Sequence, residues 1–117
     1  NFRDDPAADI AEGIEAIVNS LKQKCPSSEI LLLGPLPTGA DNNDPMRIKY
    51  HKVHDLIAPL GNISKVRYKN IGGAYIMEDG TLNYSLMRQD NVHLAPKGYY
   101  VWAENIQTEV DEIFGNQ

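Results

Sequence analysis

An aspartate and a histidine stand three residues apart in the segment QDNVHLAPKGYY, residues 89–100. On a turn, the carboxylate of Asp90 can fold back and accept a hydrogen bond from Nδ1–H of His93. This bond would fix the tautomer of the ring and leave Nε2 to take up a proton. We expect the carboxylate to be buried, where it would also stabilise the imidazolium. Pro96 opens the next predicted helix and gives the pair a rigid support, so the pattern indicates the acid and base of a hydrolase.

The sequence offers no recognisable nucleophile for such a pair. None of its serines follows Gly-Asp, and the Gly-x-Ser-x-Gly pattern is absent; the serines are Ser20, Ser27, Ser28, Ser64 and Ser85. Cys25 is the single cysteine, so there is no internal disulfide framework, and it has no CxxC partner. We expect Cys25 to be a small residue at a helix end.

Histidines elsewhere raise a second possibility, a metal site. His51 and His54 are three residues apart on a predicted helix, and either could join Asp90 and His93 as a metal ligand. No further ligand is obvious, so we expect a polar, solvated helix face. The Asx-rich loop 35–45 lacks the spacing of an EF-hand. We therefore expect neither a metal nor a cofactor.

Composition excludes several classes of protein. The 117 residues suffice for one domain at most, and the hydrophobic fraction of 42% is that of an ordinary globular protein. A net charge of −5 without a basic run argues against a nucleic-acid partner. No apolar stretch approaches the roughly 20 residues that a membrane span needs.

Periodicity predicts three helices and two strands. A first helix over 5–23 has Asp5 as its cap, Pro6 at its first position, and a core-facing stripe of Ile10, Ile14, Ile17, Val18 and Leu21. The apolar run 30–34 predicts a strand buried on both faces, and 65–70 alternates like an edge strand.

A second helix over 46–58 carries Met46, Tyr50, Val53 and Ile57 on one face, and a turn is expected at the Glu-Asp-Gly of 78–80. A last helix over 96–114 ends at Gly115 and has a stripe of Tyr99, Trp102, Ala103, Ile106, Val110 and Ile113. Helices that alternate with parallel-type strands indicate a three-layer α/β/α fold. Two strands are few for such a sheet, so part of it is expected to be missing.

The closing segment resembles the last block of the SGNH (GDSL-type) hydrolase family, Asp-x-x-His-Leu followed by Gly-Tyr. Asp90, His93, Leu94, Gly98 and Tyr99 match it. Upstream, residues 7–39 resemble the family's branch similar to platelet-activating-factor acetylhydrolase catalytic subunits. There a helix precedes a strand ending in Leu-Leu-Pro, and Leu36-Pro37 holds that place.

The resemblance implies a flavodoxin-like fold and a serine esterase with a Ser–His–Asp triad. Asp90 and His93 would be the catalytic acid and base, and the substrate would be a small-molecule ester with a short acyl or acetyl group. Tyr84 and Met87 could line an acyl pocket, although a packing role is the simpler interpretation. Trp102 and Tyr99 are expected in the core.

The family's Gly-Asp-Ser nucleophile and its oxyanion glycine block have no counterpart here. Asn1 resembles the tail of the Gly-x-Asn block and is a candidate oxyanion residue. We therefore expect residues 1–117 to be the C-terminal portion of one hydrolase domain, inactive alone, and to associate with the missing N-terminal half or with itself. The alternative is a non-catalytic binding or interaction module on a hydrolase-like scaffold.

Overall fold

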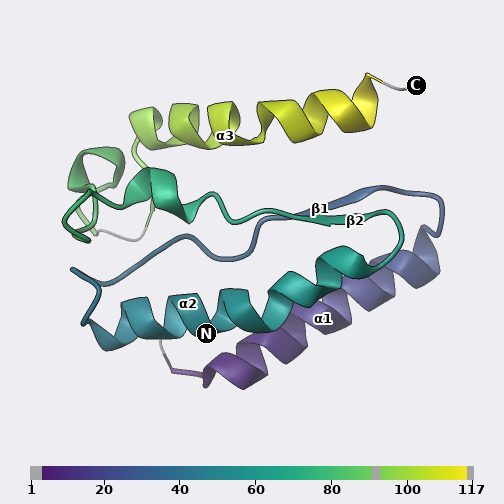
Figure 1. Cartoon of the computed structure of the whole chain (residues 1–117), viewed down its shortest axis with the longest axis horizontal. Coiled ribbons are helices and arrows are strands. Elements are labelled where there is room, and N and C mark those ends of the chain that lie inside the picture. Colours follow the sequence, from purple (N-terminus) through teal and green to yellow (C-terminus); the bar gives the residue numbers. More distant parts are fainter. Residues whose placement is uncertain (1–3, 91–92, 116–117) are drawn as a thin grey trace. The chain divides into compact units, whose positions relative to one another are not determined.

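The computed structural model describes residues 4–90 and 93–115 and contains helices, short strands and 3₁₀ turns in alternation (Figure 1). The chain forms two compact units. The first comprises Asn1–Pro35 and Ile48–Asn70, and the second comprises Leu36–Arg47 and Ile71–Gln117. The order helix, strand, helix, strand, loop, helix is the one that the sequence predicts.

Helix α1, Ala7–Lys24, begins two residues later than predicted. Pro6 is the N-cap in an extended conformation, and its carbonyl accepts the N–H groups of Asp9 and Ile10. No side chain caps the helix, so the capping role expected of Asp5 is wrong. Cys25 is the C-cap and is exposed, at the helix end where it was expected.

The buried face of α1 differs from the predicted stripe. Ala7, Ala11 and Val18 are buried, whereas Ile17 is 62% exposed and Leu21 is 43% exposed. The prediction is thus wrong for these two. Positions 7, 11 and 18 share one face of a 3.6-residue helix, and two alanines on it let the backbone approach the core closely. Ile17 and Leu21 lie to the side of that face.

Strands β1, Ile30–Leu32, and β2, Val66–Tyr68, form a parallel pair in the register Ile30↔Val66, Leu31↔Arg67 and Leu32↔Tyr68. All three residues of β1 are only half-buried, so the expectation of a strand buried on both faces is wrong within this unit. The reason is visible in Figure 1, where α1 and α2 lie on the same side of the strand pair.

Helix α2, Pro45–Ile57, continues into the 3₁₀ helix η1, Ala58–Asn62. Its predicted face is largely correct, because Tyr50, Val53 and Ile57 are at most 1% exposed. The core of the first unit joins both helices, η1 and β2; its buried members are Ala7, Ala11, Val18, Val53, Ile57, Leu60 and Val66.

Before α3, the second unit consists of short elements that are connected by main-chain hydrogen bonds. The 3₁₀ helices η2, Gly72–Tyr75, and η3, Tyr84–Leu86, flank a small hairpin bridged at Ile76↔Leu82. Its turn is the one predicted at 78–80, where Gly80 has φ +90°, a conformation that suits glycine.

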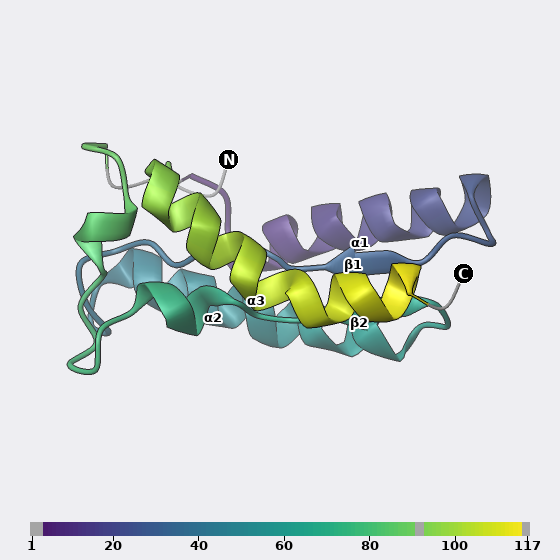
Figure 2. The ribbon, with the colours of Figure 1, turned by 90° about the horizontal axis from the view of Figure 1, so that it is seen from above.

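Helix α3, Pro96–Phe114, has the bounds that the sequence predicts, and Figure 2 shows the helix from above. Gly115 is its C-cap. Gly98 and Ile106 are buried. The predicted stripe is wrong for Ala103, which is exposed, and for Tyr99, which is 57% exposed and not in the core. Trp102 is half-buried.

Candidate active site

Asp90 and His93 form a hydrogen-bonded pair in the second unit. Nδ1 of His93 lies 2.5 Å from Oδ2 of Asp90, and the main-chain N–H of His93 donates to Oδ1 at 3.0 Å. An ionised carboxylate only accepts hydrogen bonds, so Nδ1 must carry the proton. Within residues 4–90 and 93–115 no hydrogen bond involves Nε2. The pair thus has the geometry that the three-residue spacing predicts, while its catalytic role stays a prediction.

Main-chain hydrogen bonds close the loop that carries the pair. Met87 and Leu94 form an antiparallel bridge, and the N–H of Arg88 donates to the carbonyl of His93 at 2.7 Å. One step further out, the N–H of Ala95 donates to the carbonyl of Leu86 at 2.9 Å. The loop ends are therefore fixed to each other immediately before α3.

The pair is solvent-exposed, contrary to the expectation of a buried carboxylate. The side chain of Asp90 is 48% exposed and that of His93 is 72% exposed. An open hollow beside the pair is lined by Met87, Arg88, Gln89 and Asp90. Met87 is buried and lines this hollow. Tyr84, for which a packing role was the simpler interpretation, is 48% exposed.

Ser85 is the single serine of the second unit, and its hydroxyl is engaged elsewhere. Oγ donates to Oδ1 of Asn83 at 2.6 Å, and the main-chain N–H of Ser85 donates to the same oxygen. The other serines belong to the first unit. Asn1, the candidate oxyanion residue, lies outside the described residues.

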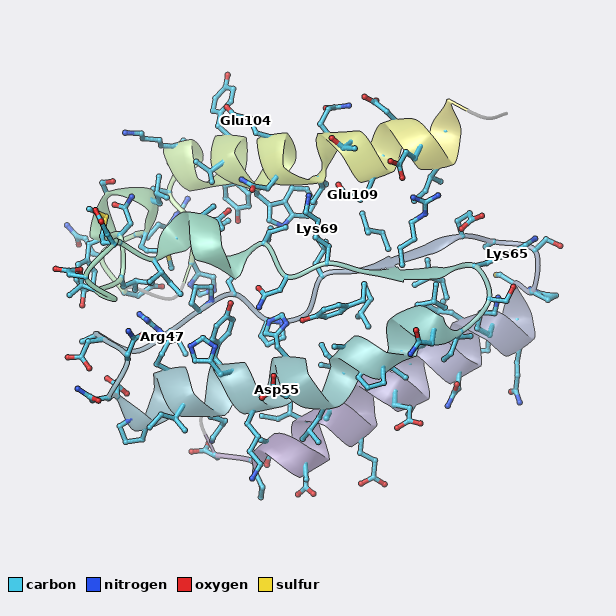
Figure 3. All side chains as sticks on the ribbon, in the orientation of Figure 1. Arg47, Asp55, Lys65, Lys69, Glu104 and Glu109 are labelled. Carbon is cyan, nitrogen blue, oxygen red and sulfur yellow. The ribbon has the colours of Figure 1, made fainter. Side chains whose placement is uncertain are left out.

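Arg47 is a buried cation that sequence reasoning missed. It is fully buried, and Figure 3 shows its side chain at the amino end of α2. The guanidinium donates to the carbonyls of Thr38, Gly39 and Gly80 at 3.1, 3.0 and 2.7 Å, and to Oδ1 of Asn42 at 3.1 Å. It therefore connects loop 38–42 to the 78–80 turn by satisfying main-chain oxygens.

His54 is the second buried polar residue, and the expectation that it lies on a solvated face is wrong. It is 4% exposed, with Nε2 2.7 Å from the carbonyl of Pro35 and Nδ1 2.6 Å from the hydroxyl of Tyr68. A carbonyl only accepts, so Nε2 carries the proton and Tyr68 donates to Nδ1. Burial lowers the pKa of His54 and holds the ring neutral. His51 is exposed, as expected.

A helical pattern through α2 could have revealed both residues. Arg47, Tyr50, His54 and Ile57 recur at spacings of three, four and three, which is one face of a helix. Attention to apolar residues alone selects Met46 instead of Arg47 as the start of that face. Met46 is only half-buried.

Residues 4–90 and 93–115 contain no group of three or more His, Cys, Asp or Glu side chains that could hold a metal ion. In the same part of the chain, the helices all fall short of the length and hydropathy that crossing a membrane requires.

Sequence comparison finds relatives among acetylhydrolase subunits, although no family model matches the chain. The chain is 35% identical over 100 residues to platelet-activating factor acetylhydrolase IB subunit alpha2 of Rattus norvegicus. This alignment covers 85% of the chain and 43% of the relative. It is 31% identical over 94 residues to platelet-activating factor acetylhydrolase IB subunit alpha1 of Homo sapiens. This alignment covers 80% of the chain and 40% of the relative. The chain thus spans less than half the length of these relatives.

Structural comparison finds a similar fold in the esterase domain of the ZfL2-1 ORF1 protein from the zebrafish ZfL2-1 retrotransposon. The TM-score is 0.73 at 16% identity, and the match covers 92% of the chain and 60% of that domain. At this identity the likeness concerns the fold. It confirms the three-layer α/β/α class with a parallel sheet that the order of the elements predicts.

Proposed function

The chain belongs to the SGNH hydrolase family, in the branch similar to the platelet-activating-factor acetylhydrolase subunits, and from this premise we propose that the complete protein hydrolyses carboxylic esters through a Ser–His–Asp triad. In this proposal Asp90 and His93 are the acid and base. The observation that carries it is the 2.5 Å pairing of Nδ1 with Oδ2, which directs the basic nitrogen Nε2 away from the carboxylate.

The chemistry follows from the protonation state of the pair. Nε2 of His93 takes the hydroxyl proton of the serine as its oxygen attacks the ester carbonyl, and then gives this proton to the departing alcohol. A water molecule repeats the sequence and releases the acid. Asp90 keeps the ring in the Nδ1–H tautomer and stabilises the imidazolium that forms in each half-reaction.

The serine and the oxyanion donors belong, in this proposal, to a part of the domain outside residues 1–117. The bond from Ser85 to Asn83 supports this view, because it occupies the hydroxyl of the one serine in the same unit as the pair. Asn1 stays the candidate oxyanion residue. We further propose that residues 1–117 are the C-terminal portion of the hydrolase domain and are inactive alone.

The exposure of the pair fits a site that another segment completes. A carboxylate that is 48% exposed and an imidazole that is 72% exposed interact more weakly than they would in a water-excluded site. The proposed partner is the N-terminal half of the same domain, with a second copy of the chain as the other candidate. The substrate class, short acyl or acetyl esters, rests on the name of the relatives, acetylhydrolase.

Labelling with a fluorophosphonate probe, read by intact mass spectrometry, tests the proposal, because the probe reacts with an activated serine. We expect an adduct on the complete protein and its loss in the His93→Ala variant. His51→Ala, which changes an exposed histidine of α2, is the matched control and should be labelled like the wild type.

Two results would reject the triad. One is the absence of labelling in a complete protein that contains a Gly-Asp-Ser segment, and the other is labelling that survives His93→Ala. Either would favour the second candidate, a non-catalytic binding module on a hydrolase-like scaffold. Labelling of residues 1–117 alone would overturn the assignment of the nucleophile to another segment.

A further inference from the structure

Tyr75 is a fully buried side chain at the end of η2 that the proposed mechanism does not use. Its hydroxyl donates to the carbonyl of Gly98 at 2.9 Å, in the first turn of α3. Its main-chain carbonyl accepts the N–H of Asn83 at 2.8 Å, at the start of η3. One residue therefore binds both segments that flank the loop of Asp90 and His93.

The Gly98 end of this connection is in close contact with the loop. A Cβ at position 98 would overlap the carbonyl oxygen of Leu86 and would lie 3.1 Å from Cβ of Leu94. Leu86 and Leu94 are buried. Leu94 directly follows residues 88–93, the loop that carries the pair, and Leu86 lies two residues before it. A displacement of the first turn of α3 would therefore be transmitted to the ends of that loop.

The Asn83 end fixes the other side. Asn83 caps η3, since its side chain accepts the N–H of Ser85 at 3.2 Å, and η3 ends at Leu86, directly before Met87. The carbonyl of Tyr75 accepts the N–H of Asn83, and its hydroxyl donates to Gly98. The start of η3 and the start of α3 are therefore both hydrogen-bonded to the same buried residue. The bond between Ala95 and Leu86 then completes a closed frame around the pair.

We propose that Tyr75 is a positioning residue for the reaction, whose hydroxyl holds the first turn of α3 in register with η3 and thereby keeps Nδ1 of His93 on the carboxylate of Asp90. The inference rests on the proposed function, in which Asp90 and His93 are the catalytic acid and base. Burial raises the pKa of the Tyr75 hydroxyl above its usual value of 10.0, so at neutral pH the hydroxyl keeps its proton and donates it.

The test replaces Tyr75 by Phe, which removes the hydroxyl and keeps the ring and the main-chain carbonyl. The readout is the tautomer of His93, measured by nitrogen NMR on histidine-labelled protein with peaks assigned from single His→Gln variants. Tyr84→Phe is the matched control, because it removes the same group from a tyrosine that is 48% exposed and lies in η3, just before the loop. Asp90→Ala gives the spectrum of a histidine without its carboxylate.

We expect Tyr75→Phe to lower the share of the Nδ1–H tautomer toward the Asp90→Ala value, with unchanged circular dichroism, and Tyr84→Phe to resemble the wild type. In the complete enzyme kcat should fall by about ten- to a hundredfold with little change in KM, as for a catalytic group displaced by about 1 Å. Incorporation of 4-aminophenylalanine at position 75, which restores a donor, should recover both.

A wild-type tautomer in Tyr75→Phe would overturn the positioning role, whatever happens to the activity. The same holds if Tyr75→Phe loses structure and 4-aminophenylalanine restores the structure without the tautomer. The tautomer is measured without substrate. A shift in Tyr75→Phe, in a protein that shows no hydrolysis or labelling, would therefore reject the esterase function and leave the positioning role intact.

Discussion

His93 and His54 each use a ring nitrogen in a short hydrogen bond, and their surroundings give them opposite properties. In His93 the proton is on Nδ1, the partner is a carboxylate, and the side chain is 72% exposed. In His54 the proton is on Nε2, the partners are a carbonyl and a hydroxyl, and the residue is 4% exposed.

The difference separates a histidine suited to proton transfer from one suited to packing. Asp90 accepts the Nδ1–H of His93, and solvent reaches the ring. His54 has only neutral partners in a buried place, so a charge on its ring is opposed, and its two hydrogen bonds join α2 to β2 and to the segment after β1. The same side chain thus joins segments of the first unit as His54, whereas His93 in the second unit is an exposed group for which we propose proton transfer.

The largest expected effect is the loss of activity when the exposed pair is broken. In the complete protein, His93→Ala should lower kcat by about 10⁴- to 10⁶-fold, because the base is lost, and Asp90→Asn should lower it by about 10⁴-fold, because the tautomer is no longer held. Initial rates with a chromogenic acetyl ester measure both. A loss smaller than about tenfold would remove the pair from the mechanism.

The reverse pattern is expected for stability. His54→Ala should lower the free energy of unfolding by about 2–4 kcal/mol, because it leaves a cavity and removes the partners of buried polar groups. His93→Ala should change it by less than about 0.5 kcal/mol, as for other exposed sites. Urea denaturation followed by circular dichroism compares the two, and equal effects would abolish the contrast between the histidines.

Gly34 offers a finer test of the buried histidine. It has φ +70°, and a Cβ there would lie 2.6 Å from Cε1 of His54 and 2.9 Å from Cδ1 of Ile57. Gly34→Ala should therefore cost about 2 kcal/mol or more from the backbone conformation and the overlap together. Gly13→Ala is the matched control. Gly13 is exposed within α1 with nothing near its Cβ position, so alanine should stabilise the protein by about 0.5–1 kcal/mol.

The smallest effect is a dependence of stability on pH. Burial lowers the pKa of His54 from its usual 6.5, with a further lowering from His51 that Asp55 and the Pro35 carbonyl oppose. As the pH falls below about 6.5, the unfolded chain binds the proton before the folded chain does. The free energy of unfolding should therefore decrease on acidification in the wild type.

Parallel urea titrations between about pH 7.5 and 5 measure this decrease, and His54→Gln should show a smaller slope than the wild type. His51→Gln is the control on the same helix and should keep most of the slope. A His54→Gln variant with the full wild-type slope would assign the effect to other titrating groups.

Much of the local structure could be predicted from the sequence. The bounds of α3, the parallel-type strands and the turn at 78–80 follow from short-range signals. These are a proline at a helix start, an apolar run ended by glycine, an alternating segment, and a glycine in a turn. The spacing that brings Asp90 within reach of His93 is equally local, because three residues of a turn suffice to join them. These features need no knowledge of distant segments.

Burial was predicted less well, because it depends on which other element covers a given face. Ile17, Leu21 and Tyr99 have the right spacing for the core and are exposed, whereas Arg47 and His54 are polar and buried. A polar side chain can be buried only where acceptors and donors from remote segments meet it, such as Gly80 for Arg47 and Tyr68 for His54. Helical periodicity carries no information about those partners.

The sequence by itself determined the order of helices and strands, the resemblance to a hydrolase family, and the pair Asp90 and His93. Only the tertiary structure decided that His54 is a buried, neutral histidine, that Arg47 connects two loops, and that Tyr75 binds both flanks of the loop of the pair. The reason is sequence separation. Patterns within about four residues can be recognised in the sequence, whereas burial and hydrogen bonds between residues 14 to 33 positions apart arise only when the chain folds.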